Sequence, residues 1–220
     1  MIRLNITAEG FSEELFVTTI LRPHLWKFDI SVEVRKVLTS RKLRKRGGIV
    51  GYGKFKNDVR QWFKQCPDVY HTTLIDLYGL STDFPGHTET KHLQAYDRVA
   101  EMERLLKDDL GFYKFIPYIQ LHEFEALMYS DTSELEKWLS LYNKFPKNSF
   151  SIIRDSVLDS NPELINEGPD TAPSKRILKL CSTYDKVDDG VLILKEIGLN
   201  KLRQECFHFN EWLTKLEGLK

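Results

Sequence analysis

Acidic side chains follow three of the predicted strands, at the points where these strands end. They are Glu9 and Glu13, Asp76 and Asp83, and Glu123 and Glu125. The carboxyl ends of parallel strands meet at one edge of a sheet, which is where ligands gather. Carboxylates that are brought together repel one another, and a divalent cation holds them ionised. Oxygen ligands favour hard ions such as Mg²⁺ or Mn²⁺. In phosphodiester hydrolysis such ions activate the attacking water and stabilise the leaving oxygen.

Each of these acids also has a plainer interpretation. A single acid at the end of a strand is most often a helix cap or a solvated charge. Glu13 could simply favour the N-terminus of its own helix, and Asp83 could be a turn residue before Phe84 and Pro85. Glu123 and Glu125 could cap the helix that follows them. The coincidence of acids at three strand ends, rather than any single residue, therefore supports the metal site.

The elements that would position these acids alternate along the first half of the chain. Residues 1–8, 31–38, 69–77 and 115–121 have strand patterns, and residues 55–66 and 93–110 have helical spacing. A further helix begins after Ser12 as its N-cap and ends before Pro23. Residues 39–53 and 78–92 are expected to be loops, the first of them mobile. This order predicts an α/β fold with a mostly parallel sheet and helices on both faces.

The character of the chain changes after Asp131. Residues 133–142, 150–159, 174–181, 191–197, 199–206 and 209–216 read as short helices. We therefore expect an α/β core over residues 1–131 and a helical C-terminal extension over residues 132–220.

Composition places the chain among ordinary globular proteins. Hydrophobic residues make up 41% of it, and 32 Lys and Arg balance 32 Asp and Glu, so local clusters matter more than the total charge. The three cysteines lie far apart, which argues against a disulfide framework. The start of the chain does not resemble a signal peptide, and no segment predicts a membrane span. These features predict a cytoplasmic protein.

A basic stretch lies between the second strand and the next helix. Its charged residues are Arg41, Lys42, Arg44, Lys45 and Arg46, with Lys54 just beyond. They could bind a nucleic-acid backbone by displacing its counterions, with Tyr52 and Phe55 stacking on bases. A solvated loop, or a docking surface for an acidic partner, is the alternative. The four glycines of this stretch do not form a phosphate-binding P-loop, so an ATPase in this chain is not expected.

Histidines offer further candidates. His71 lies inside a predicted strand and is best explained as a core or edge residue. His87 and His92 lie in the loop near Asp83, where either could act as a general base. His122 adjoins the acidic strand end and could orient a carboxylate or contact a phosphate.

Longer segments resemble known proteins. AEGFSEELF resembles the EGxxE opening of toprim-type nucleases, which include the overcoming-lysogenization-defect group, and LIDLYGL with Asp83 resembles their second acidic motif. YIQLHEFEALMYSD, TAPSKRIL and FHFNEWLTKLE are similar to a family of small bacterial toprim-like proteins that carries a DUF-type label. The resemblance covers most of the chain.

The resemblance implies a toprim-like fold, bound Mg²⁺ (or Mn²⁺) and cleavage of DNA or RNA, tRNA included. It also implies an ATPase partner of the ABC/AAA type in phage defence. A homodimer is left open.

The resemblance also assigns roles to individual residues. Glu9 matches the general acid/base glutamate and Glu13 its companion metal ligand. Asp76 matches the first aspartate of the toprim DxD motif, but Tyr78 stands at its second position, for which Asp83 could substitute. Glu123 and Glu125 resemble the later acidic pair, and Lys175 is the candidate for the basic residue near the scissile phosphate.

Two hypotheses follow. The first is a metal-dependent endonuclease. The second is a non-catalytic interaction or regulatory module with a degenerate metal site, which the tyrosine at position 78 favours.

Overall fold

The computed structural model describes residues 1–40, 45–46, 51–142, 161–165 and 171–220. The chain divides into two compact units. Unit 1 comprises Met1–Gln120 with Thr214–Lys220, and unit 2 comprises Leu121–Leu213. The boundary expected from the sequence, after Asp131, falls at the end of a short helix inside unit 2.

Unit 1 is built on a parallel sheet. Its strands are β1 (Ile2–Ala8), β2 (Ile30–Lys36), β5 (Tyr70–Asp76), β6 (Phe115–Ile116) and β7 (Ile119–Gln120). The order is β2-β1-β5-β6, and β7 also pairs with β5. All these pairs are parallel. The predicted α/β fold with a mostly parallel sheet is therefore confirmed, and β1 and β5 are its inner strands.

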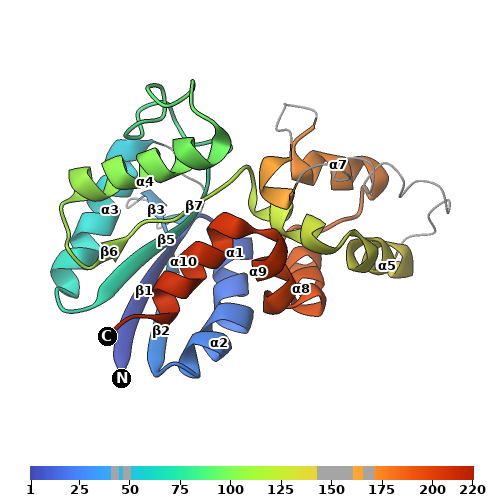
Figure 1. Cartoon of the computed structure of the whole chain (residues 1–220), viewed down its shortest axis with the longest axis horizontal. Helices are drawn as coiled ribbons and strands as arrows, with labels where there is room; N and C mark the ends of the chain where they lie inside the picture. The colour runs from blue at the N-terminus through green and yellow to red at the C-terminus, as the bar shows by residue number, and fades with distance from the viewer. Residues whose placement is uncertain (41–44, 47–50, 143–160, 166–170) are drawn as a thin grey trace. The chain divides into compact units, whose positions relative to one another are not determined.

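Helices cover both faces of this sheet (Figure 1). The connection from β1 to β2 contains α1 (Phe11–Phe16), the π-helical turn η1 (Val17–Leu21) and α2 (Arg22–Trp26). The later crossovers contain α3 (Tyr52–Gln65) and α4 (Ala95–Leu110) and run across the sheet in the opposite direction. Because such connections are right-handed, the two sets of helices lie on opposite faces.

The first helix differs from its prediction at both ends. Its N-cap is Gly10 rather than Ser12. The Glu13 carboxylate accepts the Gly10 N–H at 2.7 Å and so stabilises the earlier start. The helix also continues through Pro23. The Arg22 N–H bonds Val17 O, five residues back, and this π-helical pattern accommodates a residue that has no N–H.

The basic stretch is not a loop throughout. β3 (Leu38–Ser40) and β4 (Lys45–Arg46) form a small antiparallel pair, so the loop prediction is wrong for residues 39–40 and 45–46. The helix expected from Phe55 begins earlier, at Tyr52. The Tyr52 N–H in its first turn donates to the carboxylate of Asp83, which lies 31 residues further along the chain. The local sequence pattern could not indicate this contact.

The predicted strand over residues 115–121 is split into β6 and β7 by Pro117. Proline has no N–H to donate to the strand ladder. The Thr73 side chain fills this gap, because its Oγ1 accepts the Tyr118 N–H and donates to Tyr118 O, each at 2.8 Å. The strand direction is thereby kept up to Gln120.

Unit 2 is helical and is organised around η2 (Phe124–Asp131), whose side chains are buried up to Ser130. Among the described elements of this unit, η2 packs most closely against five. They are α5 (Thr132–Tyr142), η3 (Pro162–Leu164), α7 (Pro173–Leu180), α8 (Asp188–Ile197) and α9 (Leu199–Glu205). The last helix, α10 (Phe207–Glu217), runs from the range of unit 2 into that of unit 1.

The predicted helices of this region are found near their expected bounds, except that residues 150–159 lie outside the described part of the chain. Within the residues that the structure describes, no helix combines the length and the apolar character that crossing a membrane requires.

Candidate functional site

Two of the predicted acids adjoin at the carboxyl edge of the sheet in unit 1. Ala8 pairs with Leu74, so Glu9 and Asp76 leave the two inner strands close together. The Glu9 N–H donates to Leu74 O at 3.0 Å, and the Asp76 N–H donates to Glu9 Oε2 at 3.1 Å. Both residues are partly exposed. Part of each residue is therefore accessible to solvent.

Glu13 and Asp83 lie in the same unit but are hydrogen-bonded to helix starts. Glu13 is buried and bonds the Gly10 N–H at the start of α1. Asp83 Oδ2 accepts the Tyr52 N–H at 3.0 Å at the start of α3, and Oδ1 accepts the Ser81 hydroxyl. The Ser81 hydrogen bond is the main cause that lowers the pKa of Asp83. These hydrogen bonds match the plainer interpretation of the two acids, as groups that stabilise helix N-termini.

A lysine that sequence reasoning did not single out lies at the same edge. Lys36 ends β2, pairs in register with Ala8, and is only 8% exposed. Its ammonium group forms an ion pair with Glu14 and lies 3.7 Å from the centre of the Phe11 ring. The signal that could have found it is its position at the end of a strand beside the one that leads to Glu9.

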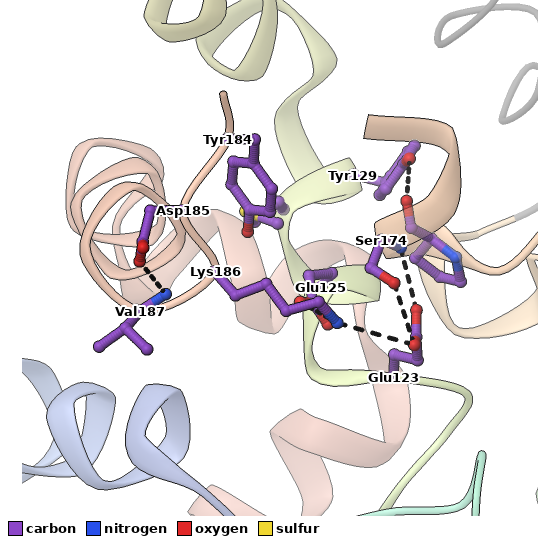
Figure 2. Close-up of polar contacts among 10 residues, drawn as sticks. Glu123, Glu125, Tyr129, Ser174, Tyr184, Asp185, Lys186 and Val187 are labelled. Carbon is purple, nitrogen blue, oxygen red and sulfur yellow. Dashed lines mark hydrogen bonds and ion pairs between the residues drawn. The ribbon is translucent and has the colours of Figure 1, made fainter. Parts of the chain in front are cut away.

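Unit 2 holds the other acidic pair, and Figure 2 shows its contacts. Glu123 Oε2 accepts the Ser174 N–H at 2.9 Å, and Oε1 accepts the Ser174 hydroxyl at 3.1 Å. Ser174 lies in the first turn of α7, after Pro173. The Glu123 carboxylate thus caps a helix that lies 51 residues further along the chain.

Glu125 is 4% exposed and pairs with Lys186, whose Nζ lies 2.9 Å from Oε1 (Figure 2). The same Nζ lies 3.9 Å from Glu123 Oε1. Burial raises the pKa of Glu125, and the Lys186 charge opposes this shift. One cation therefore faces two buried carboxylates. Neither Lys186 nor Ser174 was identified from the sequence.

A second buried glutamate of unit 2 has the same structural role. Glu163 is fully buried, and its two oxygens accept the N–H groups of His208 and Phe209 at 2.9 Å each. These donors belong to the first turn of α10. Unit 2 thus uses distant glutamates as helix caps at two places.

Lys175 and His122 are the remaining candidates in unit 2. Lys175 follows Ser174 on α7 with its side chain exposed. His122 has a left-handed backbone, with φ of 62°, at the turn into η2. This turn leads directly to Glu123. Histidine is among the residues that tolerate this conformation.

The predicted nucleic-acid-binding residues are only partly described. Arg41, Lys42 and Arg44 lie outside the described residues, and Lys45 and Arg46 form β4. Lys54 lies on α3 and is exposed.

Comparison with known proteins places the chain in a family. A family model described as a domain of unknown function, DUF4276, matches residues 8–217. The chain belongs to the DUF4276 family. Its predicted membership in a DUF-type family is thus confirmed. No curated protein matches it.

Solved structures with similarity to the DUF4276 chain are C-terminal regions of OLD proteins. The region from Burkholderia pseudomallei is 17% identical, with 98% of this chain and 97% of that chain covered and a TM-score of 0.49. A region from Xanthomonas campestris pv. campestris is 14% identical, with 98% of each chain covered and a TM-score of 0.43.

The donor set of the DUF4276 chain limits the kind of metal site it could form. Among the described residues, no three His, Cys, Asp or Glu side chains lie close enough together to hold a metal ion. Mg²⁺ usually binds through one or two carboxylates and keeps several waters or takes oxygens from a substrate phosphate. Glu9 and Asp76 supply the two carboxylates that one such ion would need. They do not by themselves fit an ion held by protein side chains alone.

Proposed function

We propose that the DUF4276 chain is a toprim-type nuclease domain that uses Mg²⁺ or Mn²⁺ to cleave phosphodiester bonds of DNA or RNA. The observation that supports this most is the adjacency of Glu9 and Asp76 at the carboxyl ends of the two inner strands. This edge is the ordinary ligand-binding edge of an open parallel sheet. The EGxxE-like sequence at residues 9–13 supports the same conclusion.

Glu9 and Asp76 would each contribute a carboxylate to the site at this edge. The Asp76 N–H fixes one oxygen of Glu9, so the Glu9 carboxylate has a defined orientation. Asp76 ends the neighbouring strand and brings a second carboxylate from a rigid element. Together they would hold one divalent ion, which when bound activates water and offsets charge on the phosphate. Both residues are partly exposed, so a substrate phosphate would approach them from solvent.

The direct test is cleavage by the purified chain. Single-stranded DNA, duplex DNA and tRNA are incubated with Mn²⁺ or Mg²⁺ and with wild type, Glu9→Gln or Asp76→Asn. Glu9→Gln keeps an oxygen that can accept the Asp76 N–H, so the variant is expected to fold and lose cleavage. Glu33→Gln and Asp68→Asn, which change exposed acids elsewhere in unit 1, are the matched controls and are expected to cleave normally. Equal cleavage by all variants would refute the proposal.

Metal binding is measured separately by calorimetry with Mn²⁺. Loss of partners that only support metal ligands already weakens metal binding about 10- to 100-fold. We expect at least this loss in Glu9→Gln and Asp76→Asn, and unchanged binding in the two controls.

The resemblance of the sequence to toprim-type nucleases supports an ABC/AAA-type ATPase partner and a role in phage defence, and we propose a cytoplasmic location. A chain that is inactive alone and cleaves nucleic acid when co-expressed with its ATPase neighbour would support that arrangement.

A non-catalytic interaction module is the second candidate. Tyr78 at the second acidic position favours it, and so does the engagement of Glu13 and Asp83 at helix starts. Mn²⁺ binding that Asp76→Asn abolishes would count against a degenerate metal site.

A further inference from the structure

An aromatic ring lies exposed at the same edge of the sheet as Glu9 and Asp76. Phe11 is the first residue of α1, is 59% exposed, and follows Glu9 by two residues. Single exposed apolar side chains are common and need no explanation by themselves. What distinguishes Phe11 is that the lysine against its ring is itself nearly buried.

The Lys36 ammonium lies 3.7 Å from the centre of that ring, within the range of a cation–π interaction. Lys36 is nearly buried and is also paired with Glu14. It ends β2, so its position is set by the sheet itself. Phe11 is therefore held on one face by a fixed cation, and its high exposure means that the opposite face is open to solvent.

We propose that Phe11 is a stacking surface for an unpaired nucleobase of single-stranded nucleic acid next to the Glu9–Asp76 site. This inference rests on the proposed nuclease function and specifies which form of nucleic acid the site takes. Aromatic side chains bind single strands in this way because every base has a flat face, whereas bases in a duplex are already stacked. The Lys36–Glu14 pair positions the ring.

The distance along the chain sets which base would stack. Two residues span at most about 7 Å, and successive bases of a stacked strand are about 3.4 Å apart. A base that contacts Phe11 therefore lies within about two nucleotides of the phosphate at Glu9 and Asp76.

Other exposed aromatic residues of unit 1 supply internal controls. Phe28 lies just before the start of β2, and Tyr113 lies just before the start of β6. Both are at the amino ends of their strands, away from the edge that carries Glu9. Their replacement removes a similar exposed ring without touching the proposed stacking position.

The experiment measures binding apart from cleavage. Fluorescence anisotropy follows single-stranded DNA, single-stranded RNA and duplex DNA, in Ca²⁺ and in EDTA, with wild type, Phe11→Ala, Phe11→Trp, Phe28→Ala and Tyr113→Ala. Loss of one base–aromatic stack weakens binding about 5- to 150-fold. We expect Phe11→Ala to lose this factor for single strands alone, Phe11→Trp to keep wild-type binding, and the two controls to bind as wild type does.

An abasic nucleotide then tests the contact itself. It is placed singly at each position within two nucleotides of the mapped cleavage point. At one of these positions it should weaken the binding of the strand to wild type and leave the binding to Phe11→Ala unchanged. The stacking role is refuted, and the nuclease proposal stands, if wild type binds and cleaves single strands, Phe11→Ala binds them equally well, and every abasic strand binds wild type as the intact strand does. If wild type neither binds nor cleaves any nucleic acid, both proposals are refuted.

Discussion

Replacing Glu123 by Gln tests whether this buried carboxylate is a helix cap or a metal ligand. The change keeps the shape of the side chain and removes its charge. In the structure the two Glu123 oxygens accept two donors of Ser174, at 2.9 and 3.1 Å. Gln keeps one oxygen that can accept the Ser174 N–H, and its NH₂ group must instead donate to Ser174 Oγ. Hydrogen bonds to charged groups contribute about 1.5–3 kcal/mol and neutral ones about 0.5–1.5 kcal/mol, so each of the two contacts weakens by about 1 kcal/mol.

Loss of a negative charge at the N-terminus of α7 adds about 0.3–1 kcal/mol. The sum is a destabilisation of about 2–3 kcal/mol. In a chain of this length 1 kcal/mol shifts the melting temperature by about 2–4 °C, so the expected decrease is about 4–12 °C. The control is Glu134→Gln, which breaks an exposed ion pair with Lys137 and should cost less than about 1 kcal/mol.

Thermal unfolding is followed by circular dichroism or calorimetry, in EDTA and in Mg²⁺. A helix cap predicts the same decrease in Tm for Glu123→Gln in both buffers. The reasoning is refuted if Glu123→Gln melts like the Glu134→Gln control in EDTA. A Mg²⁺-dependent rise in wild-type Tm that this variant abolishes would then identify Glu123 as a metal ligand instead.

Two further predictions concern pH. Burial lowers the pKa of His71 to about 4, below its ordinary 6.5, so the unfolded chain binds the extra proton first and stability is lost as pH falls from 6.5 towards 4. The free energy of unfolding should fall by about 3 kcal/mol over this range. Urea unfolding of wild type and His71→Phe at several pH values should show their stability difference changing by that amount. A difference that stays constant with pH would contradict the prediction. Burial raises the pKa of Glu125, so its contribution to stability is full below the ordinary value of 4.5 and is lost as pH rises through the folded value. Glu125→Gln should therefore gain stability relative to wild type between pH 5 and pH 8, and an equal difference at both pH values would count against this.

The sequence predicts the sheet of unit 1 because its signals are local. The buried, β-branched stretch around Thr72 and Thr73 and the apolar spacing of α4 each indicate one element without reference to the rest of the chain. Errors occur where a neighbour decides the outcome. Ser12 has the better side chain for an N-cap, but Glu13 accepts the Gly10 N–H and fixes the N-cap two residues earlier.

The contacts of the candidate sites were less predictable for the same reason. The meeting of Glu9 and Asp76 follows from parallel strands, whose carboxyl ends share an edge. The partners of Glu123 and Glu125 do not follow from any local pattern, because Ser174 and Lys186 come from distant helices and loops of unit 2. A proline at the first position of α7 marks a helix start that can take an acid, but it does not say which acid.

The acids at the strand ends thus separate by what they contact rather than by where they occur in the sequence. Asp83 and Glu123 accept backbone N–H groups at helix starts, which is a sufficient structural reason for an acid at those positions. Glu125 contacts a lysine side chain rather than a helix start, and burial disfavours its charged form. Lys186 is partly exposed, so water could solvate its ammonium group in the absence of Glu125. Glu9 and Asp76 differ again, because they adjoin at an accessible sheet edge beside Lys36 and Phe11. Mutation of each set should therefore affect a different property: stability for Asp83 and Glu123, and metal-dependent activity for Glu9 and Asp76.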